Sequence, residues 1–264
     1  PFSAWPDSPS SCSIVVEGCE NVNAVGRSLS AALGLCTRAC IVRTMPAPKP
    51  QPSPEMYRRI YAKFEAPVSR FDCGRKCAPH NGGTPVCCST EHAVPLVDKH
   101  EWNLLKSRTD LWRPYRPHDA EGRKIVADLH RDCRTIECKG AEHCERENRT
   151  LSCRAFPFLP YLTRGDELLG LAYFWGFEER CWVLSNLAIV DRTFARECLD
   201  AYEVLFAHDA EERTAHREES ASMRRVFARW KRPIPLLDRE GRWHAIEPGT
   251  HIVRRAAPRL FPRH

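Results

Sequence analysis

The chain has 264 residues and a formal net charge of +6, from 40 lysines and arginines against 34 aspartates and glutamates. Charges of both signs are mixed along it, as on an ordinary solvated surface, so a nucleic-acid partner is not expected. No apolar run approaches the roughly 18–20 residues that span a bilayer, and 14 cysteines, about 5% of the chain, are too few for a small disulfide scaffold.

Residues 1–55 predict a disordered leader and a proline-rich linker. Five prolines alternate with other residues from Pro46 to Pro54, which favours an extended, semi-rigid segment. Met45 is the first methionine, so residues 1–44 are either a non-native extension before the natural start or a native leader. They lack the basic start and apolar core of a secretory signal. We therefore expect a cytoplasmic, reducing setting, where clustered cysteines are metal ligands or redox groups before they are disulfides.

Residues 56–190 are expected to form a cysteine-rich domain with irregular loops. Asp98 followed by Glu101 is a capping-box signature that predicts the start of a helix. Short apolar runs do not distinguish strand from buried helix, so two segments, 168–177 and 182–189, stay open between them. The helix that starts at Asp98 is expected to carry Trp102, Leu104 and Leu105 and to be broken by the two prolines within 112–118. The other predicted elements are helices at 56–64 and 121–130, and loops at 71–90 and 133–153.

Residues 191–264 predict a helical extension that ends in a hairpin and a basic tail. Apolar residues recur at helical spacing from Phe194 to Phe206 and again from Met223 to Trp230, which indicates one long or two consecutive amphipathic helices. Apolar runs at 234–237 and 243–246 flank Gly241, a pattern typical of a hairpin. The predicted fold class is α+β, mostly α with irregular loops: a small metal-organised domain with a helical C-terminal extension.

The cysteines of the central region have a spacing that indicates metal ligands. The first cluster is Cys73-x3-Cys77-x9-Cys87-Cys88; the second holds Cys133, Cys138, Cys144 and Cys153, and Cys181 follows. Thiolate is the form that binds metal, and the arginines and lysines in both clusters would help thiols to lose their protons.

The same spacing bears on the kind of centre. Zinc ribbons use C-x2-C pairs, and the closest spaced pair here is C-x3-C, so an iron–sulphur cluster or a less regular zinc site stays open. Side chains of adjacent residues usually diverge. The pair Cys87-Cys88 therefore suggests two centres, or one ligand beside a free thiol.

These cysteines, with the segment Cys153-Arg154-x-Phe156-Pro157, resemble those of the YkgJ-like cysteine-cluster proteins, a family described as zinc- or iron-chelating. The resemblance covers residues 71 to 181. Cys133 and Cys138 compete for one family position, and Cys138 is favoured. The resemblance implies metal ligation by Cys73, Cys77, Cys87, Cys88, Cys138, Cys144, Cys153 and Cys181.

We therefore expect a metal-binding protein that holds an iron–sulphur cluster, with a redox or electron-transfer role and an unidentified protein or redox partner. The alternatives are a structural zinc module without catalysis and a disulfide-bonded protein. No nucleophile elbow, phosphate loop or dinucleotide fingerprint is present, so no enzyme class is indicated. Cys198 lies on an apolar helix stripe and is expected in the core, and His80, His92 and His143 are expected at the surface.

Overall fold

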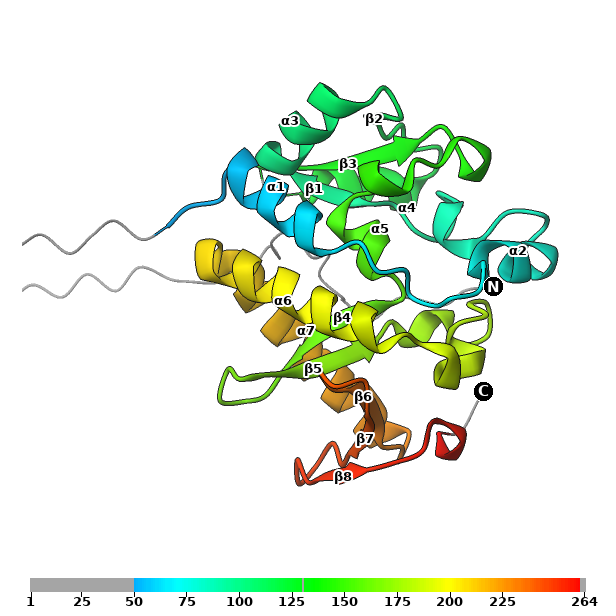
Figure 1. The fold of residues 1–264 in the computed structure, drawn as a ribbon, viewed down its shortest axis with the longest axis vertical. Helices are drawn as coiled ribbons and strands as arrows, with labels where there is room; N and C mark the ends of the chain where they lie inside the picture. The colour runs from blue at the N-terminus through cyan, green and yellow to red at the C-terminus, as the bar shows by residue number, and fades with distance from the viewer. Residues whose placement is uncertain (1–49, 130, 262–264) are drawn as a thin grey trace, which may run out of the picture.

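The computed structural model describes residues 50–129 and 131–261, so the predicted leader over residues 1–44 lies outside the described residues (Figure 1). The described part combines helices with two antiparallel sheets, which confirms the α+β class. None of its helices has both the length and the apolar character needed to cross a membrane.

The first sheet has three strands in the order β1-β3-β2, with β1 at Leu96–Asp98, β2 at Trp112–Pro114 and β3 at Cys133–Cys138. The prediction of a loop over 133–153 is therefore wrong at its start. Strand β3 is central because it pairs with β1 on one side and with β2 on the other. The polar composition of this segment does not suggest a central strand. Glu137 is nevertheless buried there, because its carboxylate forms a salt bridge with Arg113 at 2.7 Å.

Helices α1 (Pro54–Lys63) and α3 (Lys99–Arg108) both begin at side-chain caps, of which the sequence predicted the one at Asp98. Ser53 Oγ accepts the Met56 N–H at 3.2 Å, and Asp98 Oδ1 accepts the His100 and Glu101 N–H groups at 2.7 Å each. Glu101 does not complete the capping box. Its carboxylate instead lies inside the protein, where it joins three helices. The shorter helices of this region are α2 (Cys73–Cys77), α4 (Ala120–Ala127) and α5 (Leu151–Ala155).

The second sheet has five strands in the order β4-β5-β6-β7-β8. The pairing of Leu171 in β5 with Leu237 in β6 joins the chain on both sides of residue 190 into one sheet. The predicted hairpin is confirmed as β6–β7, with Gly241 at φ +75° in its turn. The strands are β4 (Phe158–Leu162), β5 (Leu168–Tyr173), β6 (Ile234–Leu237), β7 (Trp243–Ile246) and β8 (Val253–Arg255).

Two consecutive helices, α6 (Arg192–His208) and α7 (Ala210–Arg229), lie against the second sheet. The break falls at Asp209, which ends α6 and whose Oδ1 accepts the Glu211 and Glu212 N–H groups at 3.0 and 2.9 Å. This settles the choice between one helix and two, because a strong N-cap begins a new helix. The two segments left open between strand and helix also differ. Residues 168–173 form a strand, whereas 184–189 form 3₁₀ structure interrupted by a kink at Asn186.

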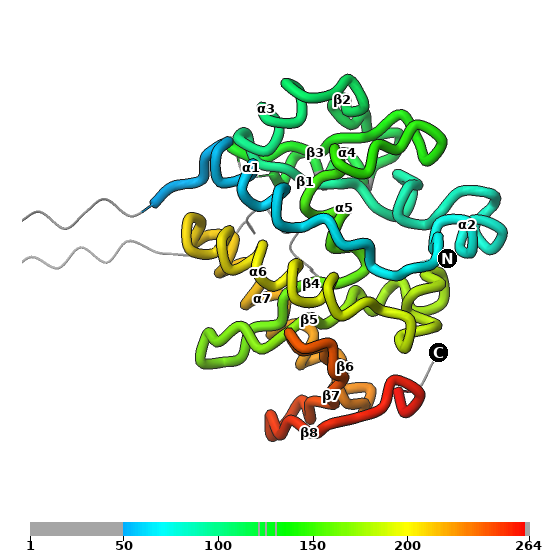
Figure 2. Tube along the Cα trace, in the orientation of Figure 1, coloured from blue at the N-terminus to red at the C-terminus, as the bar shows by residue number. Residues whose placement is uncertain are grey.

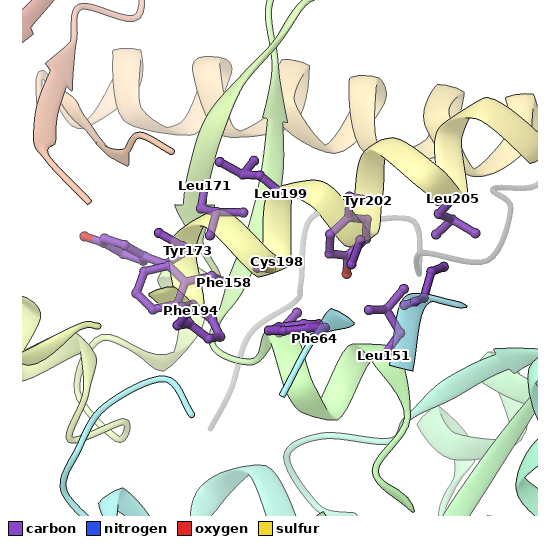
Figure 3. Packing of buried hydrophobic residues seen from close by; sticks show 14 of the residues in the cluster. Phe64, Leu151, Phe158, Leu171, Tyr173, Phe194, Cys198, Leu199, Tyr202 and Leu205 are labelled. Carbon is purple, nitrogen blue, oxygen red and sulfur yellow. The ribbon is translucent and has the colours of Figure 1, made fainter. Parts of the chain in front are cut away.

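The main core lies where α6 crosses between α1 and the strand β4 (Figure 3). The Phe194 ring lies 5.7 Å, between centroids, from each of Phe64 and Phe158, so one side chain joins three elements. Cys198 is fully buried in this layer, as expected for a core cysteine. The core fixes α1 and β4, and with them the loops that carry the thiols.

Candidate metal centre

The loop that carries the first cysteines runs beside the segment that follows β5 (Figure 2). Cys73 and Cys77 lie at the two ends of α2, and Cys87 and Cys88 lie in a 3₁₀ turn at Val86–Cys88. Gly82 and Gly83 have φ of +64° and +90°, a backbone conformation that other residues rarely adopt. They reverse the chain between α2 and the turn that carries Cys87 and Cys88. The first thiols are thereby brought towards the later ones.

The first set of thiols, the Cys181 group, comprises Cys73, Cys77 and Cys181. The Cys77 thiol donates to the Arg180 carbonyl at 3.4 Å, which places Cys77 next to the segment that carries Cys181. The Asn81 side-chain amide, at 3.1 Å, and the Val86 N–H, at 3.4 Å, donate to Cys77 Sγ. The pKa of Cys181 rises to about 12, mainly because of burial and in smaller part because of the charges of Cys77 and Cys73.

The second set, the Cys88 group, comprises Cys87, Cys88, Cys138, Cys144 and Cys153. Burial raises the pKa of Cys153 to about 12, and the nearby charges of Cys88 and Cys138 also raise it. Burial raises the pKa of Cys138, again with contributions from Cys88 and from Cys144. Thiols in the 3₁₀ turn at Val86–Cys88, on β3 and on α5 therefore lie near enough to shift one another's pKa, although about 65 residues of chain separate the first from the last.

The adjacent side chains of Cys87 and Cys88 do not diverge as the sequence suggested. Their sulphur atoms lie 3.9 Å apart, because the chain turns here, whereas successive side chains point to opposite sides in an extended strand. Two thiolates on one tetrahedral ion, each at ~2.3 Å, lie roughly 3.8 Å apart. Both sulphurs can therefore face a single ion.

Arg149 is the cation that acts on both groups. Its Nε donates to Cys144 Sγ at 3.0 Å. Its charge also lowers the pKa of Cys73, against a larger increase from burial. The pKa of Cys88 falls to about 7, mainly because of its contact with the Cys87 thiol; burial opposes this shift, and the charge of Arg149 adds to it. Arg154 supports Arg149 by donating from its Nε to the Arg149 carbonyl at 3.2 Å.

Four further sequence candidates have other partners or are exposed. Cys133 is disulfide-bonded, so Cys138 is the free thiol of the two that compete for one position. His92 contacts the guanidinium of Arg180, with Nε2 2.9 Å from Nη1, and His80 and His143 are exposed. Across residues 50–129 and 131–261, no three His, Cys, Asp or Glu side chains are already grouped so that they could hold a metal ion.

Sequence reasoning missed the hydrogen-bond donors around the sulphurs. Asn81 is an ordinary loop residue in the sequence, and the backbone amides of Gly140, Val183 and Leu184 carry no sequence signal at all. The Gly140 N–H donates to Cys138, and the N–H groups of Val183 and Leu184 donate to Cys181, which in each case lowers the pKa of the thiol against the larger effect of burial. Such donors stabilise thiolate, the ligand form.

The resemblance to the YkgJ-like family was drawn from motifs within residues 71 to 181. No protein-family model, curated protein or solved structure matches the chain, so that resemblance stays a prediction from the sequence.

Proposed function

We propose that this chain binds a metal centre through its clustered thiols, and that the centre is an iron–sulphur cluster with a redox or electron-transfer role. The proposal depends on one observation. Thiols from three separate parts of the chain, around residues 73–88, 138–153 and 181, lie close enough to act on one another's charge. The ligands would be Cys73, Cys77, Cys87, Cys88, Cys138, Cys144, Cys153 and Cys181.

The energetics of these thiols support a metal. Burial holds Cys153 and Cys181 in the neutral form at pH 7, with pKa values of about 12. Yet Cys77 and Cys181 each accept two N–H hydrogen bonds, which favour a negative sulphur. A bound cation reconciles the two, because it replaces the thiol protons and keeps the sulphur charge compensated inside the protein.

The number and surroundings of the thiols favour iron and sulphide over one zinc ion. A structural zinc site is closed by four ligands, and eight free thiols lie in the two groups. Hydrogen bonds to sulphur and a nearby positive charge set the potential of an iron–sulphur cluster, and Arg149 supplies both at Cys144. When bound, the cluster would accept and donate single electrons.

A structural zinc module is the second candidate, and the 3.9 Å separation of Cys87 Sγ and Cys88 Sγ supports it, since zinc is tetrahedral in such sites. In that case the thiols of the Cys88 group would organise the loops around β3 and α5 without any reaction.

Anaerobic purification, a visible spectrum and analysis for iron, sulphide and zinc test the proposal. We expect a brown protein that absorbs near ~400 nm and loses its metal in Cys88→Ser. Cys198→Ser is the matched control, because Cys198 is a free, fully buried cysteine in the core, and it should keep the metal. Colourless protein with stoichiometric zinc would favour the second candidate, and protein free of any metal would overturn both.

A further inference from the structure

A small pocket lies where β1 and the helices α1, α3, α5, α6 and α7 meet. Its cavity has a volume of about 30 Å³, which is room for roughly two water molecules or one ammonium group. Among the described residues that line it, four are acids and two are tyrosines, and none is a lysine, an arginine, a histidine or a cysteine. The acids and tyrosines are Asp98, Glu101, Asp209, Glu212, Tyr57 and Tyr202.

The hydroxyl of Tyr202 is the observation that indicates a ligand in this pocket. Tyr202 is 5% exposed, and its side chain reaches from α6 towards Leu151, another lining residue (Figure 3). Within the part of the chain that the structure describes, no group hydrogen-bonds to this hydroxyl. The Tyr57 hydroxyl, by contrast, donates to Asp98 Oδ2 at 3.1 Å. A buried hydroxyl without a partner is unfavourable, so a ligand that bonds to it would be stabilised.

Three of the acids keep a carboxylate oxygen for a ligand. Glu101 uses Oε1 for both of its hydrogen bonds, and Asp209 uses Oδ1 for both of its own. Glu212 Oε1 lies 3.3 Å from Nε2 of the buried His216, which leaves Oε2. These oxygens are not grouped as in a metal site, because across residues 50–129 and 131–261 no three His, Cys, Asp or Glu side chains could hold a metal ion. An ammonium group presents three N–H donors in different directions, as an amine of this kind requires separate acceptors.

The acids lie close enough to act together on one tyrosine. Burial raises the pKa of Tyr57 well above its ordinary value, and the charges of Glu101, Asp98 and Glu212 raise it as well. A positive charge in the pocket would reduce this repulsion between like charges. The aromatic rings of Tyr57 and Tyr202 would add a further attraction for a cation that contacts their faces.

The remaining wall of the pocket is apolar and suits a hydrocarbon chain. It is formed by Leu96, Val97 and Leu205. Asp209 and Glu212 are half-buried, whereas Tyr202 is buried, so the acids of α7 lie nearer the solvent and the free hydroxyl lies deeper. A ligand with a charged head and a short alkyl chain matches this arrangement of oxygens and leucines.

We propose that this pocket binds the ammonium group of a small primary alkylamine. Glu212 and Asp209 accept N–H groups of the ammonium, Tyr202 Oη accepts another, and the alkyl chain contacts the leucines. No bond is made or broken in the ligand, so the pocket is a binding site. The inference does not depend on the proposed metal centre and would stand if the thiols bound no metal.

Thermal unfolding of the full chain, with its metal content unchanged, tests the ligand class. At neutral pH n-butylamine is protonated, and it should raise the unfolding midpoint in a saturable manner, because a ligand that binds only the folded state stabilises it. n-Butanol, which has the chain without the charge, and K⁺ at the same ionic strength should give no saturable rise. If n-butylamine has no saturable effect, or if K⁺ has the same effect, the proposal is overturned.

Two variants test the residues by calorimetric titration with n-butylamine. Glu212→Gln should weaken binding on the order of 10-fold, as loss of a charged hydrogen-bond partner does. Tyr202→Phe removes only the unpartnered hydroxyl, so the free protein should keep its stability while binding weakens several-fold. Glu211→Gln is the matched control, because Glu211 is the exposed neighbour of Glu212 and does not line the pocket. Unchanged affinity in both pocket variants, or an equal loss in Glu211→Gln and Glu212→Gln, would refute the site.

Discussion

Glu101 provides a test of the architecture that does not depend on metal. Its side chain is 3% exposed, and its Oε1 accepts the Tyr61 hydroxyl at 2.5 Å and the Leu151 N–H at 2.6 Å. It thus ties α1 and α3 to α5, the helix that carries Cys153. Burial raises the pKa of Glu101 to about 8, the two hydrogen bonds lower it, and the charges of Asp98 and Glu212 raise it.

The sign of the pH dependence follows from this raised pKa. Between the ordinary value of 4.5 and about 8, the folded chain binds a proton at Glu101 that the unfolded chain has released. The free energy of unfolding therefore falls as pH rises through this window. A rise from 4.5 to about 8 corresponds to a total loss of about 5 kcal/mol, of which roughly half falls between pH 5.5 and 7.5.

The perturbation is Glu101→Gln, which keeps an oxygen for Tyr61 and Leu151 but cannot ionise. Urea unfolding at pH 5.5 and 7.5, each with the same metal content, gives the free energy of unfolding of both proteins. Wild type should lose about 2–3 kcal/mol more than the variant between the two pH values. Glu219, whose pKa burial raises to about 7, acts in the same direction in both proteins and cancels in the comparison. Equal losses in the two proteins would refute the reasoning.

Two further predictions concern the thiol groups and the second sheet. Arg149→Gln removes the donor to Cys144 and should weaken Zn²⁺ or iron binding on the order of 10-fold, as loss of an outer hydrogen-bond partner does. Arg149→Lys keeps the charge and should lose less affinity. Chelator competition measures both affinities, and equal metal affinity in wild type and both variants would contradict this prediction. Gly170→Ala places a Cβ 2.6 Å from the Leu237 carbonyl oxygen between β5 and β6 and should destabilise the fold by about 1–3 kcal/mol. Gly176→Ala, where nothing lies within 4 Å, is the matched control and should change the free energy of unfolding by no more than about 0.5 kcal/mol in the same denaturation assay.

Local signals in the sequence predicted several elements correctly. The Asp98 side chain accepts N–H groups from residues at most three positions away, so the start of α3 could be read directly. The equivalent cap at Asp209 was not read, and the choice between one helix and two stayed open. The apolar spacing from Phe194 to Phe206 is likewise a property of one helix, and it predicted α6 and the burial of Cys198. Strand β3 could not be read in this way, because Glu137 is stabilised by Arg113 on another strand.

The same contrast between local signals and contacts of distant residues applies to the candidate site. By itself, the sequence determined which cysteines to consider, because ligand spacing is a local pattern, and it favoured Cys138 over Cys133. Only the tertiary structure decided which thiols are neighbours, that the sulphurs of Cys87 and Cys88 face the same way, and that Arg149 acts on both groups. The physical reason is that charge and hydrogen bonding act through space over a few ångströms, whereas the groups concerned lie up to about 100 residues apart in the chain.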